Sequence, residues 1–158
     1  MLILGIDPGL CTGMCLYDTT KGQIWAGLMG DQGLETRARY ANVALIEKPR
    51  IYPGPKQKAD PNDIITLAVR AGEIAGKFRA ENTAMTVQYV YPQDWKRGLS
   101  KEITKSRLLE PWGPSRMPTL SDRERGMITN VLALPQSKQH NALDAIGIAL
   151  FGAGRKLF

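Results

Sequence analysis

The sequence predicts an α/β fold in which helices pack on a mixed β-sheet. Two short apolar runs, LILGI (2–6) and VALI (43–46), indicate strands that are covered on both faces. Residues 12–28, between these runs, have the pattern of an antiparallel hairpin. A long helical pattern then separates the second run from a further strand, and a crossover of this kind joins parallel strands. Antiparallel strands followed by a crossover therefore predict a mixed sheet.

The predicted elements follow from local patterns, taken in chain order. Residues 12–18 and 23–28 form the hairpin strands, and Gly22 in the turn between them can adopt a positive φ. Residues 31–41 are polar and leave room for one or two turns of helix before the second buried strand. The segment RIYPGPKQK (50–58) follows that strand and predicts an exposed loop.

The longest predicted helix begins at Asp60, which can act as its N-cap, with Pro61 at the first helical position. Gly72 and Gly76 would let this helix approach another backbone closely. Residues 84–91 alternate in polarity and predict a half-buried strand. The apolar positions of the helix recur at helical spacing and form one stripe, made of Ile64, Leu67, Ala68, Ala71, Ile74, Ala75 and Phe78.

The last third of the chain is predicted to be helical. Ser121 and Glu124 form a capping box for a helix that ends near Pro135. The segment NALDAIGIALFGAG (141–154) predicts a final helix that is apolar on nearly every side. These helices complete the set that would cover the sheet.

Composition restricts the class of protein. A chain of 158 residues with 43% hydrophobic and 23% charged residues predicts one globular domain over 1–158. We expect a soluble protein without a signal peptide or a membrane span. Cys11 and Cys15 are too few for a disulfide scaffold, and their spacing on a predicted strand makes both core residues. The net charge of +6 favours a polyanionic partner only slightly, since many basic proteins bind nothing anionic.

Three carboxylates occupy positions where a negative charge is costly. Asp7 and Glu47 end two buried strands that the crossover places side by side and parallel. Functional groups of open α/β sheets gather at these strand ends. Asp144 lies among apolar neighbours on the final helix. Three converging carboxylates repel one another, a divalent cation relieves the repulsion, and oxygen ligands select Mg²⁺ or Mn²⁺.

Each acid also has a structural explanation. Asp7 precedes a Pro-Gly pair and could begin a turn, and Glu47 could pair with a cation on the surface. Asn141 and Asp144 could be the N-cap and N3 residues of the final helix. Taken singly these explanations are about as good as a functional one. Taken together, two buried strands that end in an acid and an acid on an apolar helix favour a site.

Segments in the expected order resemble motifs of a known family. ILGIDPGLCTG (3–13), VALIEKP (43–49) and HNALDAIGIAL (140–150) resemble three motifs of the RuvC family of Holliday junction resolvases, in the ribonuclease H-like superfamily. DPNDIITLAVRAGEIAG (60–76) and YPQDWKRGLSKE (91–102) are similar to segments of phage-type members. The resemblance implies a ribonuclease H-like fold, with a five-stranded mixed sheet of order 3-2-1-4-5 flanked by helices.

The resemblance also implies the chemistry. Two Mg²⁺ ions per active site, for which Mn²⁺ can substitute, would support hydrolysis of a phosphodiester in branched DNA. Asp7 would bridge both ions, while Glu47 and Asp144 would each bind one. The family usually has Asp or His three positions before its last aspartate, whereas this chain has Asn141 there and His140 one residue earlier. Either residue could complete the site, although an exposed structural position explains His140 equally well.

Basic residues near these motifs are candidates for contacts with nucleic acid. One group follows Glu47, and the other lies in 96–107, where a solvated helix face is an equally good explanation. An exposed Tyr52 could stack on an unpaired base. The expected contacts are Lys48, Arg50, Tyr52, Lys56, Lys58, Lys96, Arg97, Lys101 and Lys105.

The resemblance therefore implies a crossover junction endodeoxyribonuclease of DNA recombination and repair. By the resemblance it would work as a homodimer on a four-way junction, in the cytoplasm of a bacterial cell or a phage-infected host. Two alternatives stay open. One is another ribonuclease H-like nuclease that acts on RNA/DNA hybrids or RNA. The other is a non-catalytic nucleic-acid-binding relative, which the asparagine at position 141 makes conceivable.

Overall fold

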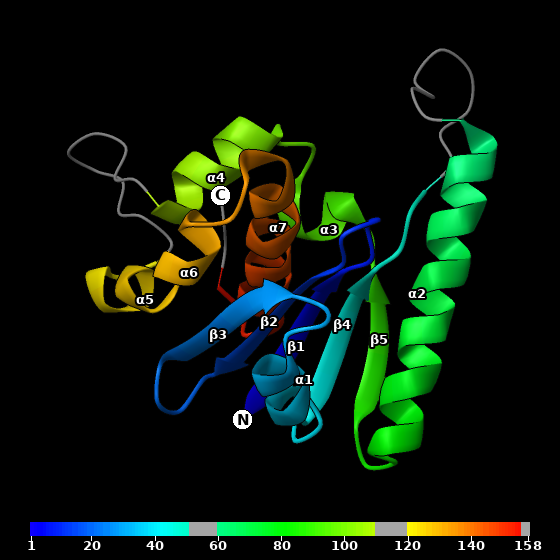
Figure 1. Ribbon diagram of the computed structural model, residues 1–158, viewed down its shortest axis with the longest axis horizontal. Coiled ribbons are helices and arrows are strands. Elements are labelled where there is room, and N and C mark those ends of the chain that lie inside the picture. Colours follow the sequence, from blue (N-terminus) through cyan, green and yellow to red (C-terminus); the bar gives the residue numbers. More distant parts are fainter. Residues whose placement is uncertain (51–59, 110–119, 156–158) are drawn as a thin grey trace.

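The computed structural model describes residues 1–50, 60–109 and 120–155, which form a five-stranded mixed sheet with helices on both faces (Figure 1). The sheet order is β3-β2-β1-β4-β5, so the predicted order 3-2-1-4-5 is confirmed. The first three strands pair antiparallel, and β4 is parallel to both β1 and β5. The strands are β1 (Leu2–Asp7), β2 (Gly13–Asp18), β3 (Gln23–Leu28), β4 (Val43–Glu47) and β5 (Thr86–Val90).

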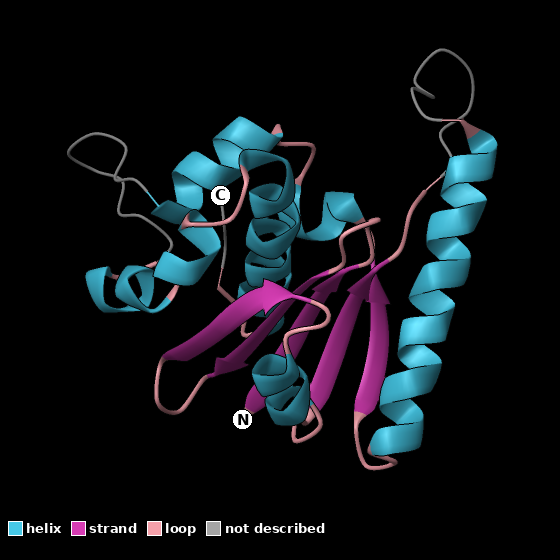
Figure 2. Cartoon of the chain, viewed as in Figure 1, coloured by secondary structure: helices cyan, strands magenta, loops and turns pink. Residues whose placement is uncertain are grey.

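Seven helices are present in the described ranges, and they divide between the two faces of the sheet (Figure 2). The central helix α7 covers one face, while α1 and the long α2 pack on the other. The helices are α1 (Gln32–Ala38), α2 (Pro61–Glu81), α3 (Pro92–Lys96), α4 (Lys101–Leu109), α5 (Asp122–Met127), α6 (Thr129–Leu132) and α7 (Gln136–Gly152). Within the described residues, no helix combines the length and apolar character needed to cross a membrane.

The alternation of side chains along the strands produces two separate cores. Ile3, Cys15 and Leu45 point toward α7, whereas Leu4 and Ile46 point toward α1 and α2. Both faces of β1 are therefore covered, as its continuous apolar run predicts. This burial holds the carboxyl ends of β1 and β4 in fixed positions.

Two glycines let α7 approach the sheet closely. A Cβ added at Gly5 of β1 would overlap with the backbone of α7 at Ala145, and one at Gly13 of β2 would overlap with it at Asn141. The polypeptide backbones of strand and helix are thus in direct contact at these points. This contact brings the N-terminal half of α7 next to the end of β1.

Several local predictions are wrong in instructive ways. The final helix begins at Gln136 rather than 141, because Pro135 supplies an extended residue that starts a helix with a polar first turn. Asn141 therefore lies inside the helix and is not its N-cap. The helix predicted to run from 121 to about 135 is broken at Ile128, whose backbone leaves the helical region. Cys11 precedes β2 and lies in a loop, so only Cys15 is a core residue.

The outer elements pack less than predicted. Ala68 in the apolar stripe of α2 is exposed, and no atom lies within 4 Å of a Cβ added at Gly72 or Gly76. The sequence prediction of a close backbone approach at these glycines therefore has no counterpart in the described residues. β5 is more exposed than a half-buried strand, since it lies at the edge of the sheet.

Candidate active site

The three carboxylates line one cleft with a volume of about 640 Å³. Asp7 and Glu47 are the last residues of β1 and β4, and these parallel strands are in register at Ile6 and Ile46. Asp144 comes from α7, which the contact with β1 and β2 brings to the same end of the sheet. The arrangement follows from the strand order together with the close approach of α7.

Asp7 is the least compensated of the three acids. Its carboxylate has no hydrogen bond or ion pair with another residue in the described part of the chain. Burial, followed by the negative charges of Glu47 and Asp144, raises the pKa of Asp7 from 3.8 to about 8, although Lys96 and Lys101 oppose this shift. A proton or another cation is therefore favoured at Asp7 near neutral pH.

Glu47 is held by the dipeptide that ends α3. The indole Nε1 of Trp95 donates a hydrogen bond to Oε2 of Glu47 at 2.7 Å, and Nζ of Lys96 lies 3.8 Å from the same oxygen. Burial raises the pKa of Glu47, in spite of both contacts. A surface pair with Lys48 or Arg50, the structural explanation for this acid, does not describe a side chain that is only 15% exposed.

Asp144 forms the tightest ion pair of the cleft. Its Oδ2 accepts a hydrogen bond from Nζ of Lys96 at 3.0 Å, and its side chain is 7% exposed. Burial alone would lower the pKa of Lys96, yet the charges of Glu47 and Asp144 raise it. One ammonium group thus lies between two of the three acids, and Asp7 has no such partner among the described residues.

The two candidates for the fourth ligand lie one turn before Asp144. Asn141 is buried, and its Nδ2 donates a hydrogen bond to the carbonyl oxygen of Cys11, so Oδ1 is the atom left to act as a ligand. His140 also lines the cleft, and burial followed by the charge of Lys101 lowers its pKa. A neutral imidazole at position 140 is able to bind a metal or accept a proton.

The donor set fits a hard divalent cation in kind, since it consists of three carboxylates and an amide oxygen. In the ranges 1–50, 60–109 and 120–155, however, no three His, Cys, Asp or Glu side chains are arranged to hold a metal ion. The Lys96 ammonium partners two of these acids, at 3.0 Å from Asp144 and 3.8 Å from Glu47.

Most of the described basic candidates lie around this cleft. Lys101 lines it, and a smaller hollow of about 160 Å³ beside it is lined by Lys101, Lys105 and His140. Nζ of Lys105 donates to Oε1 of Gln139 at 3.3 Å. Arg97 follows α3 directly. Tyr52, Lys56 and Lys58 lie outside the described residues.

Lys48 and Arg50, at the exit of β4, both contact one aromatic ring. Their cationic groups lie 5.9 Å and 5.8 Å from the centroid of Tyr91. They are therefore grouped at the carboxyl end of the sheet, although their role toward nucleic acid stays a prediction.

Sequence reasoning missed the local role of Trp95 and the ion pairs of Lys96. The sequence predicts a nucleic-acid contact for Lys96, and no local pattern connects either residue with the acids. A tryptophan N–H that becomes buried needs an acceptor, and this rule was the only available signal. The acceptor itself is 48 residues away and depends on the tertiary fold.

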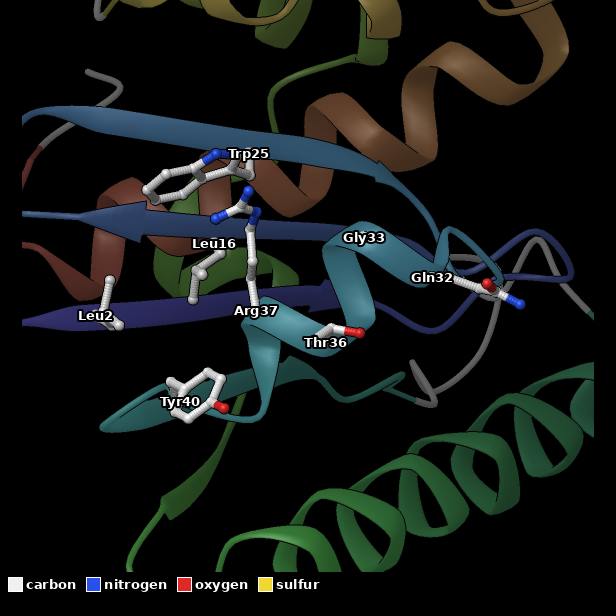
Figure 3. Close-up of a pocket in the computed structure, with 8 residues that line it drawn as sticks. All are labelled: Leu2, Leu16, Trp25, Gln32, Gly33, Thr36, Arg37 and Tyr40. Atoms are coloured by element: carbon white, nitrogen blue, oxygen red, sulfur yellow. The ribbon is translucent and has the colours of Figure 1, made fainter.

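A separate hollow, of about 700 Å³, lies between α1 and the sheet (Figure 3). Leu2, Leu16 and Trp25 line it, and the Arg37 guanidinium lies 5.3 Å from the centroid of the Trp25 ring. None of its lining residues is an acid. It adjoins the start of β1, whereas Asp7 is at the end of that strand. The cleft contains the three acids and this hollow contains none, so the cleft is favoured as the candidate active site.

Two solved structures are similar to this chain in a comparison of folds. The structure of Thermus thermophilus RuvC in complex with a Holliday junction substrate is 17% identical, with a TM-score of 0.44 over 97% of this chain and 92% of that chain. A structure of Thermus thermophilus RuvC is also 17% identical, with a TM-score of 0.33 over 98% of both chains. The fold of this chain is established by its own strand order, β3-β2-β1-β4-β5, in which β4 is parallel to both β1 and β5.

No protein-family model matches the chain, and no curated protein matches its sequence. One fold can host several activities, so a likeness of fold does not assign one of them. The chemistry of the cleft therefore has to carry the functional inference.

Proposed function

We propose that this protein is a Mg²⁺-dependent, structure-selective DNA endonuclease that resolves Holliday junctions or other branched DNA by two-metal hydrolysis. The observation that carries the proposal is the convergence of Asp7, Glu47 and Asp144, from three separate elements, in one buried and negatively charged cleft. Buried acids without sufficient counter-charge are costly in a fold, and they are a common feature of catalytic sites.

Each residue of the cleft has a proposed role. Asp7 would bridge two cations, Glu47 would bind one, and Asp144 would bind the other with Asn141 or His140 as the further ligand. Divalent cations held there would activate a water molecule and stabilise the leaving oxygen of the phosphodiester. Asp7 is suited to the bridging role because the charges of both Glu47 and Asp144 act on it. Its carboxylate also has no competing partner among the described residues.

Basic residues around the cleft would hold the nucleic acid. Lys101 and Lys105 line adjoining hollows, and Lys48 and Arg50 lie at the exit of β4. Their contacts to phosphates would be independent of base sequence and would weaken as the salt concentration rises. We further propose that residues 1–158 act as one nuclease domain in the cytoplasm. As a homodimer, the protein would present two active sites to opposed strands of a four-way junction.

One observation favours a second candidate function, a non-catalytic nucleic-acid-binding protein. Lys96 lies among the acids, and a neutral asparagine occupies position 141, so the cleft has fewer negative ligands than a site for two cations prefers. A nuclease that acts on RNA/DNA hybrids or RNA would use the same cleft. Which nucleic acid the protein cuts, and whether it cuts at all, distinguishes these alternatives.

The test is cleavage of labelled substrates by the purified protein in Mg²⁺, Mn²⁺ or EDTA. A synthetic four-way junction, a linear duplex of the same arms and an RNA/DNA hybrid would be compared side by side. We expect paired nicks near the junction in Mg²⁺ and in Mn²⁺, and none in EDTA. Faster cutting of the hybrid would favour the RNA-directed alternative. Junction binding without cutting in either metal would contradict the catalytic proposal.

A further inference from the structure

We propose that Lys96 is an internal counter-ion of Glu47 and Asp144, and that a divalent cation displaces it when the cation binds to these acids. This inference rests on the proposed function, because it assumes that the cleft binds metal. It adds a competition between a residue of the chain and the ion that the cleft would hold.

The position of the ammonium group is the first support. Nζ of Lys96 lies 3.0 Å from Asp144 and 3.8 Å from Glu47, and the lysine side chain is only 17% exposed. The group also lies 4.7 Å from the ring centroid of Trp95, which itself donates to Glu47. A lysine that served only to meet DNA would extend into solvent, whereas this side chain turns inward to the acids.

The backbone after Lys96 gives a second support. Arg97 has φ 45° and is the only residue other than glycine with a positive φ in the described ranges, and Gly98 follows with φ 74°. The N–H of Leu99 then donates to the carbonyl oxygen of Lys96 at 2.8 Å. Two consecutive left-handed residues end α3 immediately after Lys96. An unfavourable backbone at Arg97 persists only where its surroundings over-determine it, and such residues cluster at functional sites.

Charge and space make the lysine and the cation alternatives. A divalent ion that contacted Glu47 and Asp144 would lie within a few ångströms of the ammonium, and like charges at that distance repel strongly in a buried site. The acids cannot close around an ion while the ammonium lies between them. This competition accounts for acids that share a cleft without forming a ligand cluster in the described residues.

The test is the affinity for Mn²⁺, measured by titration calorimetry at pH 8 in the absence of DNA. Lys96→Met retains the aliphatic stem and removes the charge. We expect it to bind Mn²⁺ about tenfold more tightly than the unchanged protein, because the internal competitor is gone. We also expect its melting temperature to fall in EDTA and to rise further on addition of Mn²⁺ than that of the unchanged protein.

Lys101→Met is the matched control. Lys101 lines the same cleft and acts on Asp7 and Glu47 through its charge, but it forms no ion pair with the acids. A general change in the field of the cleft would affect both variants alike. Displacement of a counter-ion would affect Lys96→Met far more.

The outcomes distinguish this inference from the proposed function. If the unchanged protein binds no Mn²⁺, both fail. If it binds Mn²⁺ and cleaves junctions while Lys96→Met binds the ion equally or more weakly, only the inference fails. Should Lys96→Met not fold, acetylation of the unchanged protein by an N-hydroxysuccinimide ester gives the answer. Modification at Lys96, mapped by mass spectrometry, should be faster in Mn²⁺ than in EDTA, and equal rates would overturn the inference.

Discussion

Two buried ionic clusters of this protein differ in how well their acids are compensated. Glu124 at the start of α5 accepts hydrogen bonds from the backbone N–H of Ser121 at 2.8 Å and from its hydroxyl at 2.9 Å. Arg155 and the hydroxyl of Tyr17 also donate to it. Burial by itself would raise the pKa of Glu124, yet these donors lower it. One acid here has a complete set of partners.

The cleft at the end of the sheet has the opposite balance. Glu47 and Asp144 share the ammonium of Lys96, Asp7 has no ion pair in the described ranges, and the pKa values of Asp7 and Glu47 are raised. A fully satisfied acid holds helices in place, whereas an under-compensated group of acids retains affinity for a further cation. Burial of a carboxylate alone is therefore a poor indicator of function, and the balance of charge around it is a better one.

The largest expected effect tests the functional side of this comparison. Asp7→Asn should reduce junction cleavage about a thousandfold or more, because the group that would hold both cations becomes a neutral amide. Binding of the junction in EDTA should be retained. Asp63→Asn is the control, since Asp63 lines the same cleft from the exposed first turn of α2 and should keep most of the cleavage. Equal losses in a nicking assay would remove Asp7 from the mechanism.

The next effect concerns stability. Glu124→Gln should lower the free energy of unfolding by about 3 kcal/mol, because Arg155 loses its buried partner. Glu47→Gln should not lower it in metal-free buffer at pH 7, since the raised pKa of Glu47 shows that the fold disfavours its charged form. Urea unfolding of both variants measures the difference. A stability loss for Glu47→Gln as large as that for Glu124→Gln would erase the distinction.

The pH dependence of the two clusters should have opposite signs. The folded pKa of Asp7, about 8, lies above its ordinary 3.8, so its contribution to stability is complete below pH 3.8 and is lost as the pH rises through 8. The lowered pKa of Glu124 gives a contribution that is present above pH 4.5 and is lost as the pH falls through the folded value.

We therefore expect the free energy of unfolding in EDTA to decline between pH 5 and 8, where Asp7 dominates. Asp7→Asn should flatten this decline, and Mg²⁺ should reduce it. Urea titrations at several pH values measure the slope. A slope that persists in Asp7→Asn would assign the pH dependence to another group.

The smallest effect belongs to the structural cluster. Tyr17→Phe removes one hydroxyl that lies 3.3 Å from Oε1 of Glu124 and should cost about 1 kcal/mol. Calorimetry should find the Mn²⁺ affinity unchanged, because Tyr17 pairs with Ile3 near the start of β1, whereas Asp7 ends that strand, and the tyrosine does not line the cleft. An altered affinity would show that the two clusters are coupled.

The sequence predicted the parts of this molecule that depend on local pattern. The apolar runs that end at Asp7 and Glu47 gave the central strands, and the crossover placed them in parallel. The capping box at Ser121 is present as predicted. Periodicity is a property of neighbouring residues, so these features needed no tertiary information.

The features that sequence reasoning missed depend on residues far apart or on the backbone. Lys96 pairs with an acid 48 positions away, and the positive φ of Arg97 beside it follows from no local sequence pattern. The start of α7 at Gln136 was missed because its first turn is polar and no side chain caps it. Glu124 meets Arg155 across 31 residues, and no local pattern predicts that pair.

The contact of α7 with Gly5 and Gly13 has a consequence for how this sequence can change over time. Because the helix rests on bare backbone, the separation between Asp144 and the strand-end acids is set by main-chain thickness and not by side chains. Substitutions in surface loops and at basic residues can therefore accumulate without altering the spacing of the acids. A side chain at Gly5 or Gly13 would push α7 away from the sheet and change that spacing. Among variants selected only for activity, these two positions should therefore be as invariant as Asp7 itself.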